Sequence, residues 1–245
     1  MDQRSRPRHP VRIAVAAAIG LLLLIAIGLV VETALGPKQK PDLSPPTPIP
    51  LPGGSSVPPS PVPTPRPALA GPLQVIQGRQ LVNGVYLGYP HSMQGAVSAA
   101  VEFMTQIGSS LDPDRAAAVL RLTADPSYAS GPQDFANGAV SERRDLSLPA
   151  SGEVPAGASV VLEPAEYQAW AVNTGQVTVL LLADDVITLP DLSTQTRVGV
   201  YPLRMHWAQG DWKILRPDPA AAYSFLSAAP GSPQAAADGW KELTP

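Results

Sequence analysis

The sequence contains no cysteine and only three histidines. Without a thiol, the chain cannot form a disulfide, use a cysteine nucleophile, or bind zinc or an iron–sulfur cluster through cysteine. His9 lies in a basic leader, which leaves His91 and His206 and makes a histidine-rich metal site unexpected. The sequence therefore predicts no metal site and no cofactor site.

A second absence concerns nucleophilic catalysis. The stretch HWAQGDWKI, residues 206–214, places His206 and Asp211 close together and needs one serine to complete a hydrolase-like triad. The chain has no G-x-S-x-G sequence, the pattern that often holds such a serine on a strained turn. We therefore predict no catalytic residue and interpret the stretch as a hairpin.

Positive charge is scarce in the part of the chain that can fold. All 13 aromatic residues lie between Tyr86 and Trp240, so the core must come from the last 160 residues, which is enough for one domain. The formal net charge is −3, but residues 1–12 carry four arginines against one aspartate, and the chain from residue 80 onward is acidic. Nucleic-acid binding depends on a basic surface, so no nucleic-acid partner is expected.

One long apolar run follows the basic leader, residues 1–12. Residues 13–31, IAVAAAIGLLLLIAIGLVV, are 19 uncharged residues. At about 1.5 Å per residue a helix of this length spans close to 30 Å of hydrocarbon. With arginines before it, the positive-inside rule places the N-terminus in the cytoplasm. We therefore expect a single-pass protein of the cell membrane, in contact with the lipid bilayer through residues 13–31, with an extracellular C-terminal domain.

A cleaved signal peptide is the alternative interpretation of this run. The apolar stretch of a signal peptide is usually about 7 to 15 residues long and ends at small residues before the cleavage site. Glu32-Thr33-Ala34 fits that pattern poorly. The sequence favours a retained anchor.

Residues 32–79 are predicted to be a proline-rich, disordered linker. Fourteen of the 30 prolines lie between Pro37 and Pro72. Proline does not donate to helix or sheet ladders, and repeated proline favours an extended polyproline II spacer. At about 3.1 Å per residue, the stretch from Pro37 to Pro72 reaches on the order of 110 Å. Docking of proline-recognition modules is the alternative, and it needs a partner outside the cell.

The exported domain is predicted over residues 80–228, with helices before strands. Ser92 can cap a helix over 93–108, and Asp112-Pro113 begins a second helix that ends at Asp125-Pro126. Loops with one short helix are expected between 126 and 160. Strands are expected at 160–173, 176–189, 196–208 and 211–217, since these runs are rich in β-branched and aromatic residues and are separated by turn sequences.

This order predicts an α+β domain in which helices pack on a curved antiparallel sheet. In the last hairpin, alternation places Trp207 and Trp212 in the core and leaves His206 exposed on the other face. Gly210 is expected at a positive φ, and Asp211 is expected to bond the turn backbone.

The remaining polar candidates have structural explanations. Asp184 and Asp185 are adjacent on a strand, so their side chains point to opposite faces, and they are expected to mark a strand end or a bulge. His91, just before the first helix, is expected to have a capping or packing role. A short helix is predicted at 220–225, followed by a C-terminal tail over residues 229–245. Trp240 is expected to pack back onto the domain rather than anchor a partner.

The element order and the closing WAQGDWKI hairpin resemble the nuclear-transport-factor-2-like fold. The arginine-flanked helix, the proline spacer and this domain together resemble actinobacterial single-pass membrane proteins of conjugative elements. The segment VNGVYLGYPHSMQGAVSAAVEF is similar to a GYPH(T/S)xxGAVAAA stretch of that group. The matching positions are Gly88, Tyr89, Pro90, His91, Ser92, Gly95, Ala96 and Val97.

The resemblance implies a role like that of the extracytoplasmic assembly-factor subunit of type IV secretion systems, a scaffold that contacts other membrane-complex subunits. The sequence does not decide whether the protein forms a homo-oligomer. The alternatives are an extracellular ligand-binding or cell-wall-associated domain and, third, an enzyme of the same fold. An enzyme would need Asp184, Asp185, His206 or Asp211 to face a closed pocket with a perturbed pKa.

Overall fold

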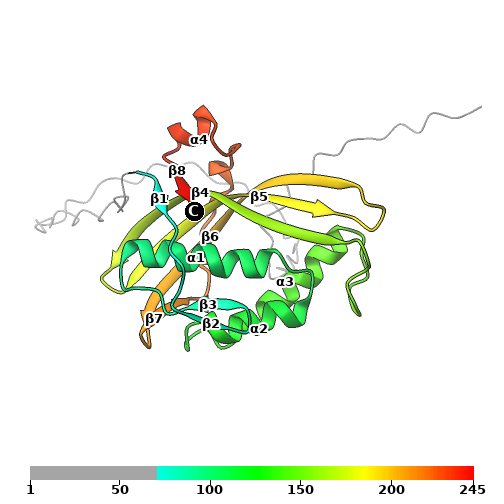
Figure 1. The fold of residues 1–245 in the computed structure, drawn as a ribbon, viewed down its shortest axis with the longest axis horizontal. Helices are drawn as coiled ribbons and strands as arrows, with labels where there is room; N and C mark the ends of the chain where they lie inside the picture. Colours follow the sequence, from blue (N-terminus) through cyan, green and yellow to red (C-terminus); the bar gives the residue numbers. More distant parts are fainter. Residues whose placement is uncertain (1–70) are drawn as a thin grey trace, which may run out of the picture.

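The computed structural model describes residues 71–245, which fold as helices packed on a curled, mostly antiparallel sheet (Figure 1). The predicted α+β class is confirmed. The predicted anchor at 13–31 and most of the predicted linker at 32–79 lie outside the described residues. Within residues 71–245, none of the helices has the length and apolar character needed to cross a bilayer.

Two of the helices begin where the sequence predicts. Helix α1 (Met93–Gly108) starts after Ser92, whose hydroxyl accepts a hydrogen bond from the backbone N–H three residues on. Helix α2 (Pro113–Thr123) starts after Asp112, whose carboxylate accepts from the N–H two residues on. Each side chain satisfies a backbone donor that has no partner within its helix, which fixes the first turn.

A third helix, α3 (Gly131–Asp145), occupies the region where loops and one short helix are predicted. That prediction is wrong, because a buried arginine conceals the apolar face. Phe135, Ala139 and Arg143 recur every four residues, and all three are buried. The Arg143 guanidinium donates hydrogen bonds to three backbone carbonyls in the loops beside the helix. These bonds replace the hydration that the charged group loses when it is buried.

The four predicted strands are confirmed, with small differences at their ends. They are β4 (Ser159–Asn173), β5 (Gln176–Thr188), β6 (Thr194–Ala208) and β7 (Asp211–Ile214), each antiparallel to the next. A register shift lies in β4 between Pro164 and Glu166. In Figure 1 the long strands curl over α1, with α2 and α3 on the same side of the sheet.

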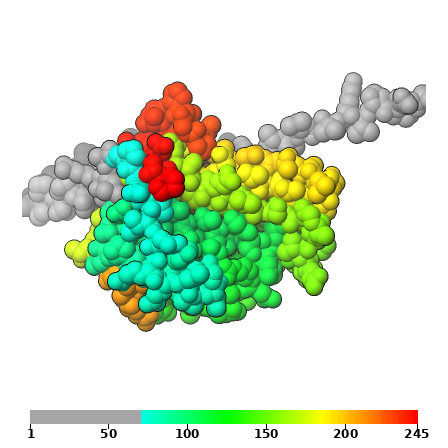
Figure 2. All heavy atoms as spheres, in the orientation of Figure 1, coloured from blue at the N-terminus to red at the C-terminus, as the bar shows by residue number. Residues whose placement is uncertain are grey.

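Chain segments outside the predicted strands extend the sheet. The strand β8 (Lys241–Thr244) pairs with β4, and β1 (Leu73–Gln74) runs parallel to β8, which gives the order β1-β8-β4-β5-β6-β7. Figure 2 shows β1 beside the C-terminal end of the chain. Residues 71–79 and 229–245, predicted as linker and tail, therefore contribute to the fold.

The C-terminal segment covers the sheet face opposite α1. It contains α4 (Pro233–Ala237) and a three-residue 3₁₀ turn (Ser224–Leu226), where a helix at 220–225 is predicted. Trp240 is 3% exposed, clusters with Leu180 and Leu182, and donates its indole N–H to the Leu226 carbonyl at 3.0 Å. The prediction that Trp240 packs back onto the domain is confirmed.

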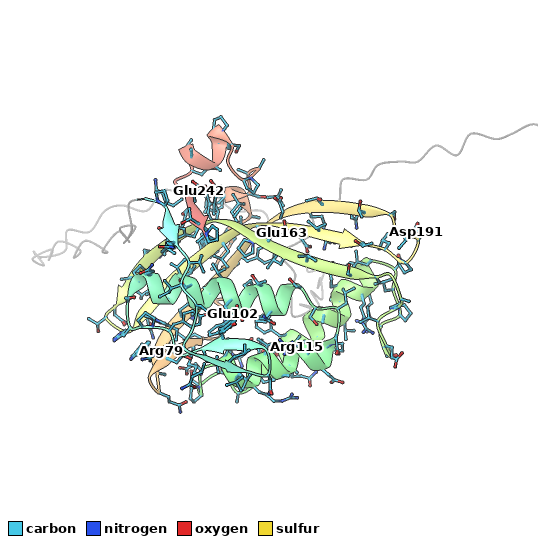
Figure 3. The ribbon with its side chains drawn as sticks, viewed as in Figure 1. Arg79, Glu102, Arg115, Glu163, Asp191 and Glu242 are labelled. Atoms are coloured by element: carbon cyan, nitrogen blue, oxygen red, sulfur yellow. The ribbon has the colours of Figure 1, made fainter. Side chains whose placement is uncertain are left out.

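A short hairpin leads into α1. It consists of β2 (Gln80–Val82) and β3 (Val85–Leu87), joined by Asn83-Gly84, both at positive φ as a tight turn of this type requires. Arg115 Nη1 donates to the Asn83 carbonyl at 2.6 Å, and Arg79 Nε donates to the Gly88 carbonyl at 2.9 Å. The two arginines flank the hairpin (Figure 3): Arg115 holds its turn, and Arg79 holds the segment that follows it.

Candidate functional site

The GYPH segment, Gly88–His91, lies against the β6–β7 hairpin, and Asp211 joins the two. The Asp211 carboxylate accepts hydrogen bonds from the N–H groups of Gly88 at 2.8 Å and Tyr89 at 3.0 Å, and from Trp212 N–H at 2.9 Å. Asp211 is 6% exposed. Asp211 was expected to bond the backbone of its own turn. Two of its three hydrogen bonds instead come from a segment more than a hundred residues away.

Two further contacts fix this junction. The Trp212 indole N–H donates to the Pro90 carbonyl at 2.9 Å. A Cβ added to Gly95 would lie 2.0 Å from the same carbonyl oxygen, so only glycine allows α1 to approach this closely. Gly210, at φ +79°, completes the hairpin turn as predicted. Two stretches that the sequence shows far apart thus form one rigid unit.

The outer side of this unit is an aromatic surface formed by Pro90, His91 and Trp207. His91 is exposed and stacks on Trp207, with ring centroids 4.4 Å apart and an interplanar angle of 7°. Its Nε2 lies 3.1 Å from the Thr174 carbonyl oxygen, which fixes the ring. The expected packing role of His91 is confirmed, and its partner is Trp207 on β6.

Burial differs between the two tryptophans of the hairpin. Trp212 is 2% exposed and belongs to the core, as predicted. Trp207 is only partly buried, so the prediction of a core position is wrong for it. Its indole packs edge-on against Trp212, with centroids 5.5 Å apart, and its other side carries His91.

His206 lies on the face opposite Trp207, but it is not the free surface residue that the alternation predicts. Its Nδ1 lies 2.7 Å from Oδ2 of Asp125, and its side chain is 35% exposed. Burial alone would raise the pKa of Asp125, but hydrogen bonds from Ser127 and His206 outweigh it and hold that pKa below its ordinary value. This pair ties β6 to the end of α2.

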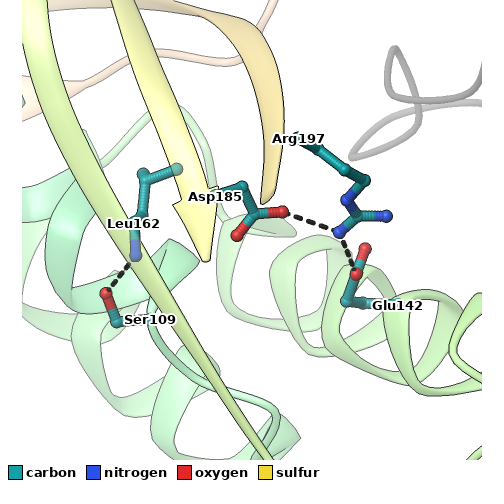
Figure 4. A network of polar contacts seen from close by, with 5 residues as sticks. All are labelled: Ser109, Glu142, Leu162, Asp185 and Arg197. Atoms are coloured by element: carbon teal, nitrogen blue, oxygen red, sulfur yellow. Dashed lines mark hydrogen bonds and ion pairs between the residues drawn. The ribbon is translucent and has the colours of Figure 1, made fainter. Parts of the chain in front are cut away.

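A separate feature lies between α3 and the sheet. It is a cavity of about 40 Å³ that holds the acidic side chains of Glu142 and Asp185, here called the acidic cavity. The Arg197 Nη2 group donates to Oδ2 of Asp185 at 2.6 Å and also to Oε1 of Glu142 (Figure 4). The lining residues are Ile107, Gly108, Ser110, Ala116, Phe135, Gly138, Ala139, Glu142, Asp145, Val160, Leu162, Asp185 and Tyr201.

Tyr201 reaches this cavity because Gly199 precedes it on the same face of β6. A Cβ at Gly199 would lie 2.8 Å from the Tyr201 hydroxyl, so the glycine makes room for the phenol. Tyr201 is 6% exposed, and its buried hydroxyl has no hydrogen-bond partner among the described residues. Native proteins seldom leave such a group unpaired.

Burial raises the pKa of both carboxyl groups in the acidic cavity. Desolvation is the largest influence on Glu142 and Asp185, and the hydrogen bonds and charge of Arg197 oppose it without cancelling it. Desolvation also raises the pKa of Tyr201, with a further contribution from the charge of Asp185. The two carboxylates are therefore incompletely compensated when ionised.

The predicted acidic pair divides as expected. Asp185 is 4% exposed and faces the cavity, whereas Asp184 lies on the other face of β5. The pair does not mark the end of β5, since pairing with β6 continues past it to Thr188. The bulge lies instead on β4, beside the position opposite Ala183. Of the four residues that an enzyme was predicted to need, Asp185 is the one that lines this cavity.

Sequence reasoning missed three residues of this site: Glu142, Arg197 and Tyr201. Glu142 lies on the unrecognised helix α3. Arg197 is directly opposite Asp185 in the β5–β6 register, which could be found by pairing the two strands back from their Thr188–Thr194 turn. In the described part of the chain, no three His, Asp or Glu side chains are grouped so that they could hold a metal ion.

A family model described as "Domain of unknown function (DUF8175)" matches residues 56–240. The chain belongs to this family. The DUF8175 match includes the GYPH segment, the β6–β7 hairpin and every residue of the acidic cavity named above. No curated protein matches the chain.

One solved structure resembles part of this DUF8175 domain. Its title is "Crystal structure of intermembrane space region of chloroplast protein ARC6". The identity is 15%, the TM-score is 0.30, and the alignment covers 47% of this chain and 87% of the other. A TM-score this low does not establish a shared fold.

Proposed function

We propose that this protein is a membrane-anchored extracytoplasmic scaffold or assembly subunit of a conjugation or type IV secretion-like machine, and that it acts through protein–protein contacts. Residues 13–31 are its single transmembrane helix, with the N-terminus in the cytoplasm. The proline-rich stretch carries the folded domain away from the bilayer. The domain would be nuclear-transport-factor-2-like, which agrees with three helices on the concave side of a curled sheet.

The observation that carries this proposal is the aromatic surface formed by Pro90, His91 and Trp207. Two of its three residues belong to the GYPH segment, on which the resemblance to conjugative-element proteins rests. Pro90 and His91 are exposed and Trp207 is partly buried, and hydrogen bonds of Asp211 and Trp212 hold the surface in place. Pre-ordered aromatic groups bind partners well because little side-chain freedom is lost on association.

The polar residues that could suggest catalysis are engaged in linking elements of the fold. Asp211 holds the GYPH segment, and His206 pairs with Asp125. Their positions are those of structural ties between distant segments. This supports a role in which the domain presents a rigid surface.

A second candidate function is ligand binding by the extracytoplasmic domain. The acidic cavity favours it, because the buried Tyr201 hydroxyl lacks a hydrogen-bond partner among residues 71–245. The cavity of about 40 Å³ is far smaller than the roughly 300 to 1,000 Å³ of sites for drug-sized ligands. Only a small group would fit.

Co-purification after mild crosslinking in native membranes tests the scaffold function. The full-length protein should recover other subunits of a transfer or secretion complex, and Trp207→Ala should recover much less. Leu192→Ala is the control, since Leu192 is an apolar residue away from this surface, 74% exposed in the turn between β5 and β6.

The control should recover partners as well as the unaltered protein does. Thermal unfolding of each variant confirms that the domain is still folded. Recovery of no transfer or secretion component would overturn the proposal. So would equal recovery by the folded Trp207→Ala variant.

A further inference from the structure

We infer that the acidic cavity is a binding site for a small alkylammonium group. This site goes beyond the scaffold function, since none of its lining residues belongs to the aromatic surface. The inference rests on three properties of the cavity: an unpaired buried hydroxyl, an excess of carboxylates, and a size and apolar wall that suit two or three heavy atoms.

The Tyr201 hydroxyl is the first property. Tyr201 is 6% exposed, lines the cavity, and its hydroxyl has no partner in the described chain. A buried hydroxyl without a partner loses its bonds to water and gains nothing in return. A bound group that donates an N–H to this oxygen would remove that loss.

The balance of charge is the second property. Three carboxylates line the cavity, those of Glu142, Asp145 and Asp185, while Arg197 is the cation that contacts two of them. Arg197 bonds to Oε1 of Glu142 and Oδ2 of Asp185, which leaves the second oxygen of each group for another donor. An alkylammonium group has three N–H donors, which is one each for Glu142, Asp185 and the Tyr201 hydroxyl.

Size and wall chemistry are the third property. A buried water needs roughly 10 to 15 Å³ of cavity volume. The cavity of about 40 Å³ therefore holds about three groups of that size. Phe135, Leu162 and Ile107 give part of the wall an apolar character. Asp145 is exposed and Asp185 is buried, so the cavity runs from the surface to the sheet. Ethylammonium, with one charged nitrogen and two carbons, matches this shape.

The same features disfavour the other small ligands. An anion would enter beside three carboxylates, and Arg197 already contacts two of them. A neutral alcohol of the same size can satisfy one oxygen but does not offset the negative charge. Charge-assisted hydrogen bonds are about twice as strong as neutral ones, so the cation should bind best.

The ammonium group could come from a free amine or from the side chain of a lysine. The chemistry in the cavity is the same in both cases. A lysine would have to pass its longer chain through the mouth beside Asp145. Ethylammonium tests the site itself. Once it binds, the affinity of N-acetyl-lysine methylamide relative to ethylammonium shows whether the lysine side chain also enters or only a free amine does.

The test is a methyl NMR titration of the full-length protein in detergent micelles. Methyl groups of Ile107, Val160 and Leu162 report on the cavity. Ethylammonium chloride should shift them saturably, with a dissociation constant no tighter than on the order of 1 mM for so small a ligand. Tetramethylammonium chloride at equal ionic strength should not, because it has no N–H donor. Ethanol should bind much more weakly.

Tyr201→Phe is the decisive variant, because it removes only the unpaired oxygen. We expect about tenfold weaker binding of ethylammonium, from loss of one hydrogen bond to a charged group. Tyr223→Phe, on the opposite face of the sheet, should leave the affinity unchanged. A purely structural Tyr201 would show no change in affinity.

Glu142→Gln gives a second measurement that does not depend on the tyrosine. It keeps the shape of the side chain and removes one negative charge, so ethylammonium should bind more weakly. The inference is overturned if ethylammonium causes no saturable shift at Ile107 or Leu162, or if ethanol and ethylammonium bind equally. Equal affinity in the folded Tyr201→Phe variant would also overturn it.

Discussion

At the scale of single residues, the domain depends on carboxylates that connect distant segments. Asp211 joins β7 to the GYPH segment, Asp125 joins α2 to His206, and Asp185 joins β5 to Arg197. All three are 6% exposed or less, so each must be hydrogen-bonded to offset the loss of water. Removing one partner of such a bond leaves the other unpaired in a buried position.

Asp211→Asn tests the first of these ties. The amide offers one acceptor oxygen and points N–H donors at backbone N–H groups, so the free energy of unfolding should fall by about 2 to 4 kcal/mol. Tryptophan fluorescence during urea unfolding measures the change. Asp184→Asn is the control, since Asp184 lies on the other face of β5, and it should change stability little. An Asp211→Asn protein as stable as that control would contradict this role.

The Asp125–His206 contact predicts a pH dependence. The pKa of Asp125 is lower in the folded protein than its ordinary value of 3.8, so the folded state favours the ionised form. This stabilisation is fully present above pH about 3.8 and is lost as the pH falls through the lower, folded value. The difference in unfolding free energy between the unaltered protein and Asp125→Asn should therefore be present at pH 5 and should shrink below pH 4. A difference that stays constant or grows there would refute the assignment.

At the scale of elements, the position of the GYPH segment depends on its close approach to the first turn of α1. Gly95 lies in the first turn of α1, where any side chain would meet the Pro90 carbonyl. This contact places His91 over Trp207, because Pro90 and His91 are adjacent in the chain. The helix packing and the aromatic surface are therefore one structural unit.

Gly95→Ala tests this coupling. The added Cβ would lie 2.0 Å from the Pro90 oxygen, so the segment must move, and the free energy of unfolding should fall by roughly 1 to 3 kcal/mol. The His91 ring should also lose its stacking on Trp207, which NMR ring-current shifts of the imidazole protons would report. Gly71→Ala, where a Cβ meets nothing within 4 Å, should leave both measurements unchanged. Unaltered imidazole shifts in Gly95→Ala would show that the two features are independent.

Local sequence signals predicted the elements whose own residues determine them. The caps of α1 and α2 and the strands β4, β5, β6 and β7 depend on nearby residues, and all were predicted. Helix α3 was missed because Arg143 occupies a core position that only its distant carbonyl partners make favourable. The strand β8 was missed because it is short and is stabilised by pairing with β4, far away in sequence.

In the candidate sites, too, the sequence predicted single residues but not the contacts between distant ones. The sequence identified His91, His206, Asp185 and Asp211 as polar residues of interest, but not their partners. The joining of Asp211 to Gly88 depends on how the hairpin packs, and the acidic cavity depends on strand register together with an unrecognised helix. Pairwise contacts of this kind are set by the tertiary fold and leave no periodic pattern in one sequence.

At the scale of the whole molecule, the proposal combines an anchor, a spacer and a rigid domain. Residues 13–31 have the length and apolar character of a transmembrane helix, and 14 of the chain's 30 prolines lie between Pro37 and Pro72. A domain held at the end of an extended spacer could meet other membrane-complex subunits at a distance from the bilayer. The aromatic surface would make that contact.

The anchor makes a simple prediction about extraction. A retained transmembrane helix keeps the protein in the membrane pellet after alkaline carbonate treatment, because its apolar side chains remain in lipid. The full-length protein should stay in the pellet, and a variant that lacks residues 1–31 should not be retained there. Release of the full-length protein by carbonate would contradict the anchor.

The central claim is that the surface formed by Pro90, His91 and Trp207 contacts other subunits of a membrane complex. Its most direct test is a photocrosslinking amino acid at Thr174, which lies beside His91, with the same group at Leu192 as the control. After illumination of living cells, mass spectrometry should identify transfer or secretion subunits bound at Thr174 and not at Leu192. Crosslinks at Thr174 to no protein, or only to a second copy of this chain, would contradict the claim.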